Sequence, residues 1–129
     1  MMYVTDTHSL IWFITESSSL SSKVKEIFEK AEKGENIIVI PTIVLAEMIH
    51  ISERKGFEES LNKIIHMVNT STNYLIYDLE VAVVLECRSL IKIPEMHDRI
   101  ITATARILKA KVLTKDKEIK DSNYIETIW

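Results

Sequence analysis

The sequence predicts a single α/β domain built on a five-stranded parallel sheet that is sandwiched by helices. Five short runs of β-branched and aromatic residues alternate with helical patterns along the chain. Parallel neighbours need crossover connections, and right-handed crossovers place helices over the faces of the sheet. The length of 129 residues suits one domain and is too short for two ordinary ones. We therefore expect residues 1–129 to fold as one unit.

The expected strands and helices follow one another through the whole chain. The strands are residues 3–5, 37–40, 74–77, 112–114 and 125–129. The helices are residues 20–33, 42–55, 58–69, 79–91 and 97–109. The chain has only two glycines and two prolines, which indicates short connections. Functional groups are therefore expected at the ends of regular elements.

Local signals mark the ends of the first helices. Ser21 or Ser22 precedes an amphipathic run and can cap it, and Gly34 then serves as a C-terminal stop. Gly56 separates the helices on either side of it. These residues support two helices before residue 70 and a break between them.

The region around residues 78–94 predicts a helix that is covered by the rest of the protein. Asp78 follows a strand and precedes a stretch, residues 81–85, that is wholly apolar. We therefore expect Asp78 to cap a buried helix, which Pro94 ends. Cys87 lies within this stretch and is expected to be a buried small hydrophobic residue and not a nucleophile.

Charge, cysteine content and hydropathy exclude several classes of protein. The net charge of −3 argues against a protein that holds nucleic acid by bulk electrostatics alone. A single cysteine forms no internal disulfide, which favours the reducing cytoplasm. The longest apolar run, residues 37–46, is too short for a membrane span, and the N-terminus lacks a secretory signal. We expect a cytoplasmic protein without a membrane partner.

Four acidic residues occupy strand exits and helix entries. Asp6 follows the first predicted strand, and Asp116 lies just past the fourth. Glu47 lies in the second turn of the helix that follows the second strand, and Asp98 lies at the start of the last helix. The carboxyl ends of parallel strands share one edge of the sheet, where such sheets bind ligands. Carboxylates gathered there repel one another unless a cation neutralises them, and Mg²⁺ suits such ligands best.

Each acid taken alone has an ordinary structural explanation. Asp6 or Asp98 could cap the helix that follows it, and Asp116 could be a turn residue. Glu47 could be an exposed charge, although its apolar neighbours argue against a solvated face. Independent capping explains all four positions only by repeated coincidence, so the combination predicts a metal site.

Several segments together resemble the PIN-domain family and, within it, the VapC-type toxins of toxin–antitoxin pairs. They are Tyr3-Val4-Thr5-Asp6-Thr7-His8-Ser9-Leu10-Ile11-Trp12, Pro41-Thr42-Ile43-Val44-Leu45-Ala46-Glu47, Asp98-Arg99-Ile100-Ile101-Thr102-Ala103-Thr104-Ala105, Leu113-Thr114-Lys115-Asp116 and Thr127-Ile128-Trp129. The resemblance covers nearly the whole chain. It implies a metal-dependent endoribonuclease that works as a homodimer and is neutralised by an antitoxin whose segment covers the acidic cleft.

The resemblance also implies roles for individual residues. Asp6, Glu47, Asp98 and Asp116 become an acidic quartet that is catalytic and binds one or two Mg²⁺ or Mn²⁺ ions, with Thr114 as a supporting polar residue. The chain departs from the family pattern in one place. Many relatives have Asp-Pro-Phe before the third acid, whereas this chain has Glu95-Met96-His97, which leaves a role for Glu95 open.

Basic residues near the acids are candidates for contacts with RNA phosphates. His8 and His97 neighbour two of the acids, and Lys115 and Lys117 flank Asp116. Such cations could hold a polynucleotide backbone beside a metal. A solvated surface is the alternative for the lysines, and a partly exposed polar position is the alternative for the histidines.

Other functions match single features of the sequence. A phospho-accepting receiver domain has a similar length and sheet, but it needs paired acids after the first strand and a Lys-Pro turn, which are absent here. The unit Glu47-Met48-Ile49-His50 matches carboxylate di-iron bundles, which need two such units and no sheet. A catalytically inactive PIN-like adaptor stays open, because intact acids do not prove turnover.

Overall fold

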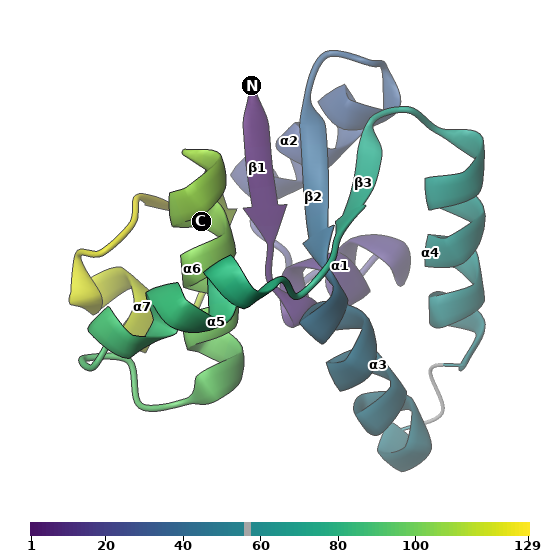
Figure 1. Cartoon of the computed structure of the whole chain (residues 1–129). Coiled ribbons are helices and arrows are strands. Elements are labelled where there is room, and N and C mark those ends of the chain that lie inside the picture. Colours follow the sequence, from purple (N-terminus) through teal and green to yellow (C-terminus); the bar gives the residue numbers. More distant parts are fainter. Residues whose placement is uncertain (56–57) are drawn as a thin grey trace.

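The five strands form one parallel sheet in the order β3-β2-β1-β4-β5, in a computed structural model that describes residues 1–55 and 58–129 (Figure 1). The strands are β1 (Met2–Thr5), β2 (Ile37–Pro41), β3 (Tyr74–Tyr77), β4 (Lys111–Leu113) and β5 (Thr127–Ile128). Every neighbouring pair is parallel. The predicted α/β class and all five predicted strands are confirmed, with ends shifted by one or two residues.

Helices connect the strands and cover both faces of the sheet. They are α1 (Thr7–Ile14), α2 (Ser22–Glu32), α3 (Thr42–Lys55), α4 (Glu58–Thr70), α5 (Val81–Glu86), the 3₁₀ turn η1 (Cys87–Ser89), α6 (Met96–Leu108) and α7 (Lys117–Ser122). In Figure 1, α2 lies behind the sheet, and α5 and α6 lie in front of its left half. Helix α6 packs on β1, β2 and β4, and α4 packs beside β3.

The strand order places a switch point between β1 and β4. From β1 the chain winds outward through β2 to β3, and it later returns to the other side of β1 as β4 and β5. At such a point the two connections leave in opposite directions and open a crevice at the carboxyl ends of the strands. The segments that follow β1 and β4 therefore border one crevice.

The core is formed by the strands and by the inner faces of α1, α2 and α6. Val4, Ile38 and Ile40 on the central strands are fully buried, as is Val112 on β4. Helix α6 packs on the sheet through Ile101 and the small residue Ala105, and its Ala103 packs on the other side against Val83 and Cys87. Close packing of this helix fixes the position of its first turn, which carries Asp98.

The predicted ends of α2 are confirmed. The Ser21 hydroxyl accepts the amide of Val24 at 3.2 Å and caps the helix. At the other end Gly34 has a φ of +81°, and the amide of Glu35 donates to the carbonyl of Lys30 at 2.8 Å. This is the turn that a glycine after a helix favours. The break predicted at Gly56 lies outside the described residues.

Two short helices were not predicted. Helix α1 carries four buried residues, Thr7, Ser9, Leu10 and Ile11, so its first turn shows no clear alternation of polar and apolar residues. Helix α7 has only six residues, which is too few for a periodic pattern. Both helices follow strand exits, and both begin directly after one of the predicted acids.

The prediction for residues 78–94 was wrong in three respects. The helix begins later than expected, with Glu80 at the N-cap, and Asp78 does not cap it. The helical stretch ends at Ser89, before Pro94, because the chain turns there to bury Leu90 and Ile93 completely. The helix is also covered on one side only, since Val83 is buried against α6 while Val81, Val84 and Leu85 are exposed. Cys87, in contrast, is buried as expected, and burial raises the pKa of its thiol.

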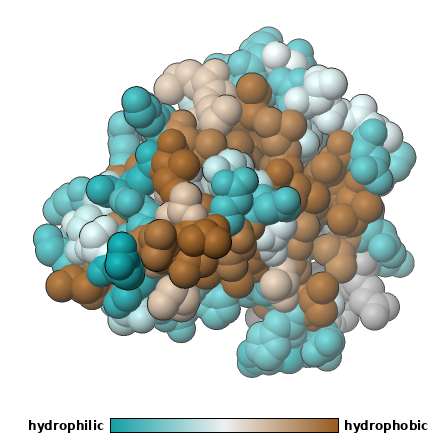
Figure 2. Space-filling model, in the orientation of Figure 1, coloured by the Kyte–Doolittle hydropathy of each residue, from teal (hydrophilic) through white to brown (hydrophobic). Residues whose placement is uncertain are grey.

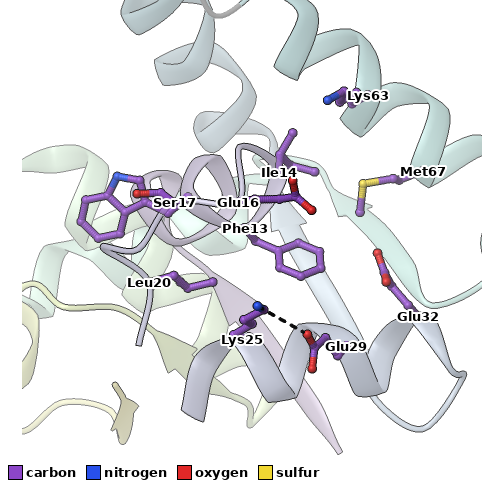
Figure 3. Close-up of a pocket in the computed structure, with 11 residues that line it drawn as sticks. Phe13, Ile14, Glu16, Ser17, Leu20, Lys25, Glu29, Glu32, Lys63 and Met67 are labelled. Atoms are coloured by element: carbon purple, nitrogen blue, oxygen red, sulfur yellow. Dashed lines mark ion pairs between the residues drawn. The ribbon is translucent and has the colours of Figure 1, made fainter. Parts of the chain in front are cut away.

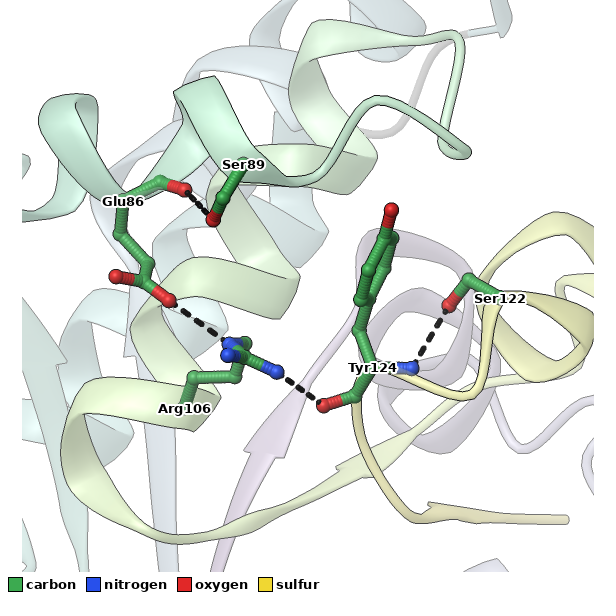
Figure 4. Close-up of polar contacts among 5 residues, drawn as sticks. All are labelled: Glu86, Ser89, Arg106, Ser122 and Tyr124. Carbon is green, nitrogen blue, oxygen red and sulfur yellow. Dashed lines mark hydrogen bonds and ion pairs between the residues drawn. The ribbon is translucent and has the colours of Figure 1, made fainter.

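A cluster around Arg106 joins α5, α6 and the C-terminal segment (Figure 4). The Arg106 side chain binds the Glu86 carboxylate at 2.8 Å and donates to the carbonyl of Tyr124 at 2.7 Å. The Tyr124 hydroxyl accepts the amide of Lys92 at 3.2 Å. These bonds hold the connection between η1 and α6, which leads into the first turn of α6.

Within the described residues, no helix has both the length and the apolar content that a membrane span requires.

Candidate active site

A cleft of about 450 Å³ opens at the carboxyl ends of β1 and β4. It is lined by Asp6, Thr7, His8, Trp12, Glu47, Glu95, Asp98, Ile101, Lys115 and Asp116. The fold thus brings all four predicted acids into one cleft, although they come from four separate segments of the chain. Glu95 joins them as a fifth acid, and of the predicted basic residues His8 and Lys115 line the same cleft.

Asp6 is held at the cleft by hydrogen bonds to both of its carboxylate oxygens. Oδ1 accepts the backbone amide of Ser9 at 2.8 Å and so caps α1, and Oδ2 accepts the hydroxyl of Thr114 at 2.5 Å. Burial raises the pKa of Asp6, and the hydrogen bonds from Ser9 and Thr114 oppose this rise. Capping and membership of the acidic cluster are therefore compatible at this position.

Thr114 connects the exits of β1 and β4. Its hydroxyl donates to Asp6 and accepts the backbone amide of Asp116 at 3.0 Å. Asp116 in turn caps α7, because its Oδ1 accepts the amide of Ile119 at 2.9 Å. The predicted supporting residue is thus in direct contact with one acid and with the backbone of another.

Glu47 reaches the cleft from the second turn of α3. Its Oε1 accepts the hydroxyl of Thr7, the first residue of α1. The Thr7 side chain is buried, so this bond fixes the Glu47 carboxylate against α1. Thr7 was not predicted as a site residue, because its position directly after Asp6 is the only signal in the sequence that points to it.

Asp98 carries the clearest electrostatic signature in the cleft. Burial, followed by the neighbouring charges of Asp116, Glu95, Glu47 and Asp6, raises its pKa from 3.8 to about 7. The cluster therefore carries more negative charge than the surrounding protein compensates.

The donor set of the cleft suits a hard divalent cation. Carboxylates and a threonine hydroxyl are oxygen ligands of the kind that Mg²⁺ and Mn²⁺ accept, and uncompensated negative charge favours a cation. Within residues 1–55 and 58–129, no three His, Cys, Asp or Glu side chains already converge as a ligand set for one ion. Mg²⁺ commonly binds through one or two carboxylates and retains several waters, so the residues fit without such convergence.

Two of the predicted basic residues lie outside the cleft lining. His97 faces Glu95, with 3.6 Å between Nδ1 and the nearer carboxylate oxygen. Lys117 is exposed on the first turn of α7. Roles for these two side chains in binding RNA stay predictions.

The aromatic ring of Trp12 forms one wall of the cleft. Trp12 was not among the predicted site residues. Its ring lies 5.5 Å from the ring of His8 and 5.8 Å from that of Trp129. The Lys115 ammonium lies 5.9 Å from the centre of the Trp12 ring. Trp12 follows His8 by four residues, so a prediction of α1 would have placed both side chains on one face.

A groove of about 440 Å³ lies on the other side of Trp12, between the α1–α2 segment and α4 (Figure 3). Phe13, Ile14 and Met67 contribute apolar side chains, and Lys25 pairs with Glu29 at 3.9 Å. The groove lacks the group of acids around a strand exit that defines the cleft. We therefore assign the chemistry to the cleft.

Comparisons with known proteins agree with this fold. In the crystal structure of VapBC2 from Rickettsia felis bound to a DNA fragment from its promoter, one chain matches with a TM-score of 0.72 and 20% identity, over 99% of this chain and 98% of that one. A chain of the FitAcB structure from Neisseria gonorrhoeae matches with a TM-score of 0.65 and 16% identity, over 99% and 97%. A search of curated protein sequences finds no significant match. The PIN domain profile matches residues 3–123, and the chain therefore belongs to the PIN domain family.

Proposed function

We propose that this protein is a metal-dependent endoribonuclease and the toxin of a type II toxin–antitoxin pair. The observation that carries the proposal is the gathering of Asp6, Glu47, Asp98 and Asp116 in one cleft at the switch point of the sheet. The raised pKa of Asp98 supports it, because it reports negative charge that a cation would neutralise. Membership of the PIN domain family supports a nuclease.

The acids supply the ligands for the reaction. Asp6 and Asp98 are proposed as the central ligands of Mg²⁺ or Mn²⁺, with Glu47 and Asp116 completing the site directly or through water. A metal bound by these acids would lower the pKa of an attacking water and would stabilise the leaving oxygen of the phosphodiester. Thr114 and Thr7 position Asp6 and Glu47 through the hydrogen bonds described above. No side chain is needed as a nucleophile.

RNA is the proposed substrate, and the cytoplasm is the proposed compartment. Lys115 and His8 lie at the cleft, where they can contact phosphates of a bound strand. Bases of a single strand can stack on exposed aromatic rings, and Trp12 presents such a ring beside the acids. A duplex offers no unstacked base to this wall, which favours a single-stranded region of RNA.

An antitoxin is the proposed protein partner, with a segment that covers the acidic cleft. The matching chain from Rickettsia felis comes from a VapBC2 assembly, and it aligns over nearly its whole length. A covering segment with basic side chains would neutralise the same acids that a metal neutralises, and it would block the substrate. This partner is proposed from the family resemblance and from that structural likeness.

A second copy of the chain is the proposed partner for an apolar face formed by α5 and its flanking segments. We call this the α5 face; its exposed side chains are Leu79, Val81, Val84, Leu85, Ile91 and Met96. Figure 2 shows hydrophobic side chains gathered where α5 lies in Figure 1. Contiguous apolar patches on soluble proteins mark interaction sites. The family resemblance implies a homodimer, and in such a dimer a second copy of the chain would cover the α5 face.

The decisive experiment measures cleavage of a panel of defined RNAs with and without Mg²⁺ or Mn²⁺. We expect metal-dependent cuts at mapped positions, and we expect Asp6→Asn to reduce the rate by about 100-fold or more, because an amide cannot replace an anionic ligand. Asp121→Asn, an exposed acid on α7, is the matched control and should cleave at the wild-type rate. Wild-type rates in folded Asp6→Asn would remove Asp6 from the site.

The same panel separates the alternatives. A catalytically inactive PIN-like adaptor would bind RNA and leave every substrate intact at all metal concentrations. A receiver-like domain would accept a phosphoryl group from acetyl phosphate, which labelling detects. A receiver domain would need a second acid next to Asp6, but the two neighbours of Asp6 are Thr5 and Thr7.

A further inference from the structure

A second, smaller cavity lies beside the acidic cleft, between α1 and α3. Its volume is about 210 Å³, and it is lined by His8, Glu47, His50, Ile51 and Arg54. His8 and Glu47 also line the acidic cleft, so the two cavities adjoin. A polymer strand that leaves the acidic cleft on this side enters the second cavity.

The side chains of α3 change character with distance from the acids. Glu47, His50 and Arg54 follow at i, i+3 and i+7, which places them on one face of the helix. At a rise of 1.5 Å per residue, Arg54 lies roughly 10 Å further along the axis than Glu47. Helix α3 leads away from the carboxyl ends of the strands (Figure 1). Outward along α3, the side chains on this face are therefore a carboxylate, then an imidazole and then a guanidinium.

Basic side chains make up a larger share of the lining of the second cavity than of the cleft. His8 reaches it from α1, and His50 and Arg54 are exposed on α3. Its one carboxylate, Glu47, is engaged by the hydroxyl of Thr7. Within residues 1–54 and 59–129, Arg54 forms no ion pair. An anionic group entering from the cleft therefore meets guanidinium and imidazole donors.

We propose that this cavity is a phosphate subsite, in which His8, His50 and Arg54 hold a backbone phosphate of RNA one or two linkages from the cleaved bond. The subsite rests on the proposed function, since it assumes that RNA occupies the cleft. Guanidinium groups bind phosphate through paired, charge-assisted hydrogen bonds. Phosphate contacts fix the register of a strand and carry no base information. The subsite thus positions the strand across the acids without selecting its sequence.

The test is single-turnover cleavage of a defined RNA by His50→Gln/Arg54→Ala in the presence of Mg²⁺ or Mn²⁺. We expect the half-saturating enzyme concentration to rise about tenfold, because a charge-assisted phosphate contact is lost, while the limiting rate stays within about twofold. The control His66→Gln/Lys33→Ala also removes one imidazole and one cationic side chain, at exposed positions on α4 and directly after α2, and should match the wild type. Equal melting temperatures establish that both variants are folded.

A second arm locates the contact on the substrate. RNAs carrying one uncharged methylphosphonate at successive linkages should bind the wild type about tenfold more weakly at a single position near the cut. His50→Gln/Arg54→Ala should show no additional loss at that position, because the two changes remove the same contact. Losses that simply multiply would overturn the subsite.

The outcomes separate this proposal from the one on which it rests. Wild-type protein that cleaves RNA, together with a variant whose parameters are unchanged, overturns the subsite and leaves the nuclease intact. An acidic protein segment would then be the better occupant of the cavity. Wild-type protein that cleaves no RNA overturns both proposals.

Discussion

Asp98 combines partial burial with four neighbouring carboxylates, and its pKa of about 7 expresses their sum. A carboxyl with a raised folded pKa destabilises the fold as it ionises, and here the penalty builds up between about pH 4 and pH 7. We expect metal-free Asp98→Asn to melt higher than the wild type at pH 7.5. Discounted for solvent exposure, the gain is on the order of 1–2 kcal/mol, or roughly 5 °C.

Acid and metal should each reduce this difference. At pH 5 Asp98 is protonated in the folded wild type, so much of the penalty is relieved and the two melting temperatures should approach each other. Mg²⁺ or Mn²⁺ should raise the melting temperature of the wild type at pH 7.5 and that of Asp98→Asn by less. Thermal melts measure both effects. An equal metal-induced shift in the two proteins would remove Asp98 from the metal site.

Single residues of the cleft were predictable where their type and position both carried information. Asp6 and Asp116 follow strands, and acids at such positions are conspicuous in a parallel sheet. Thr7 was not predictable, because a threonine is common anywhere and its importance lies in a bond to Glu47, 40 positions away. Trp12 was not predicted because α1 was not predicted. Without that helix, nothing indicates that the side chains of Trp12 and His8 lie on one face.

At the scale of elements, the strands and long helices were predictable and the short connecting helices were not. Strands β1 to β5 are runs of β-branched and aromatic residues, which the pleated sheet favours. Helix α5 shows a different limit. Its apolar residues predicted burial, but apolar content alone does not tell whether the core of the same chain or another surface covers a helix.

The connection between β4 and α7 carries its own prediction, because Lys115 lines the cleft at this strand exit. Lys115→Gln should weaken binding of all RNAs by a similar factor and lower the slope of log K against log salt by about 0.7, the value for one contact to a single strand. Affinities measured across a range of salt give the slope, with Lys33→Gln as the control. Adding Lys117→Gln tests whether the second lysine contributes. An unchanged slope for Lys115→Gln would assign that lysine to the solvated surface.

At the scale of the whole molecule, the class of the sheet was predictable and the order of its strands was not. Alternating strands and helices require parallel neighbours, whichever neighbours those are. The edge of the sheet that a later strand joins depends on packing between distant segments, such as α6 against β1 and β4. The switch point, and with it the cleft, follows from that choice.

The α5 face predicts the assembly of the molecule. Val81→Glu/Leu85→Glu places two charges in the exposed apolar face and should weaken self-association at least tenfold, because buried unpaired charges are strongly unfavourable. Sedimentation velocity over a range of concentrations measures the change. Ile65→Glu, at an exposed apolar position on α4 outside the α5 face, is the control. A wild type that sediments as a monomer at all concentrations would contradict the homodimer.

The Thr114 hydroxyl has one hydrogen, and this gives the hydrogen bonds around Asp6 a single direction. That hydrogen points to Asp6, while the backbone of Asp116 donates to the oxygen of the same hydroxyl. A chain of donors aimed in one direction strengthens each of its bonds and favours the anionic form of the last acceptor. At Asp98, in contrast, burial and repulsion from neighbouring carboxylates raise the pKa. At Asp6 the hydrogen bonds therefore oppose the rise in pKa that burial causes, whereas at Asp98 burial and the neighbouring carboxylates raise the pKa together.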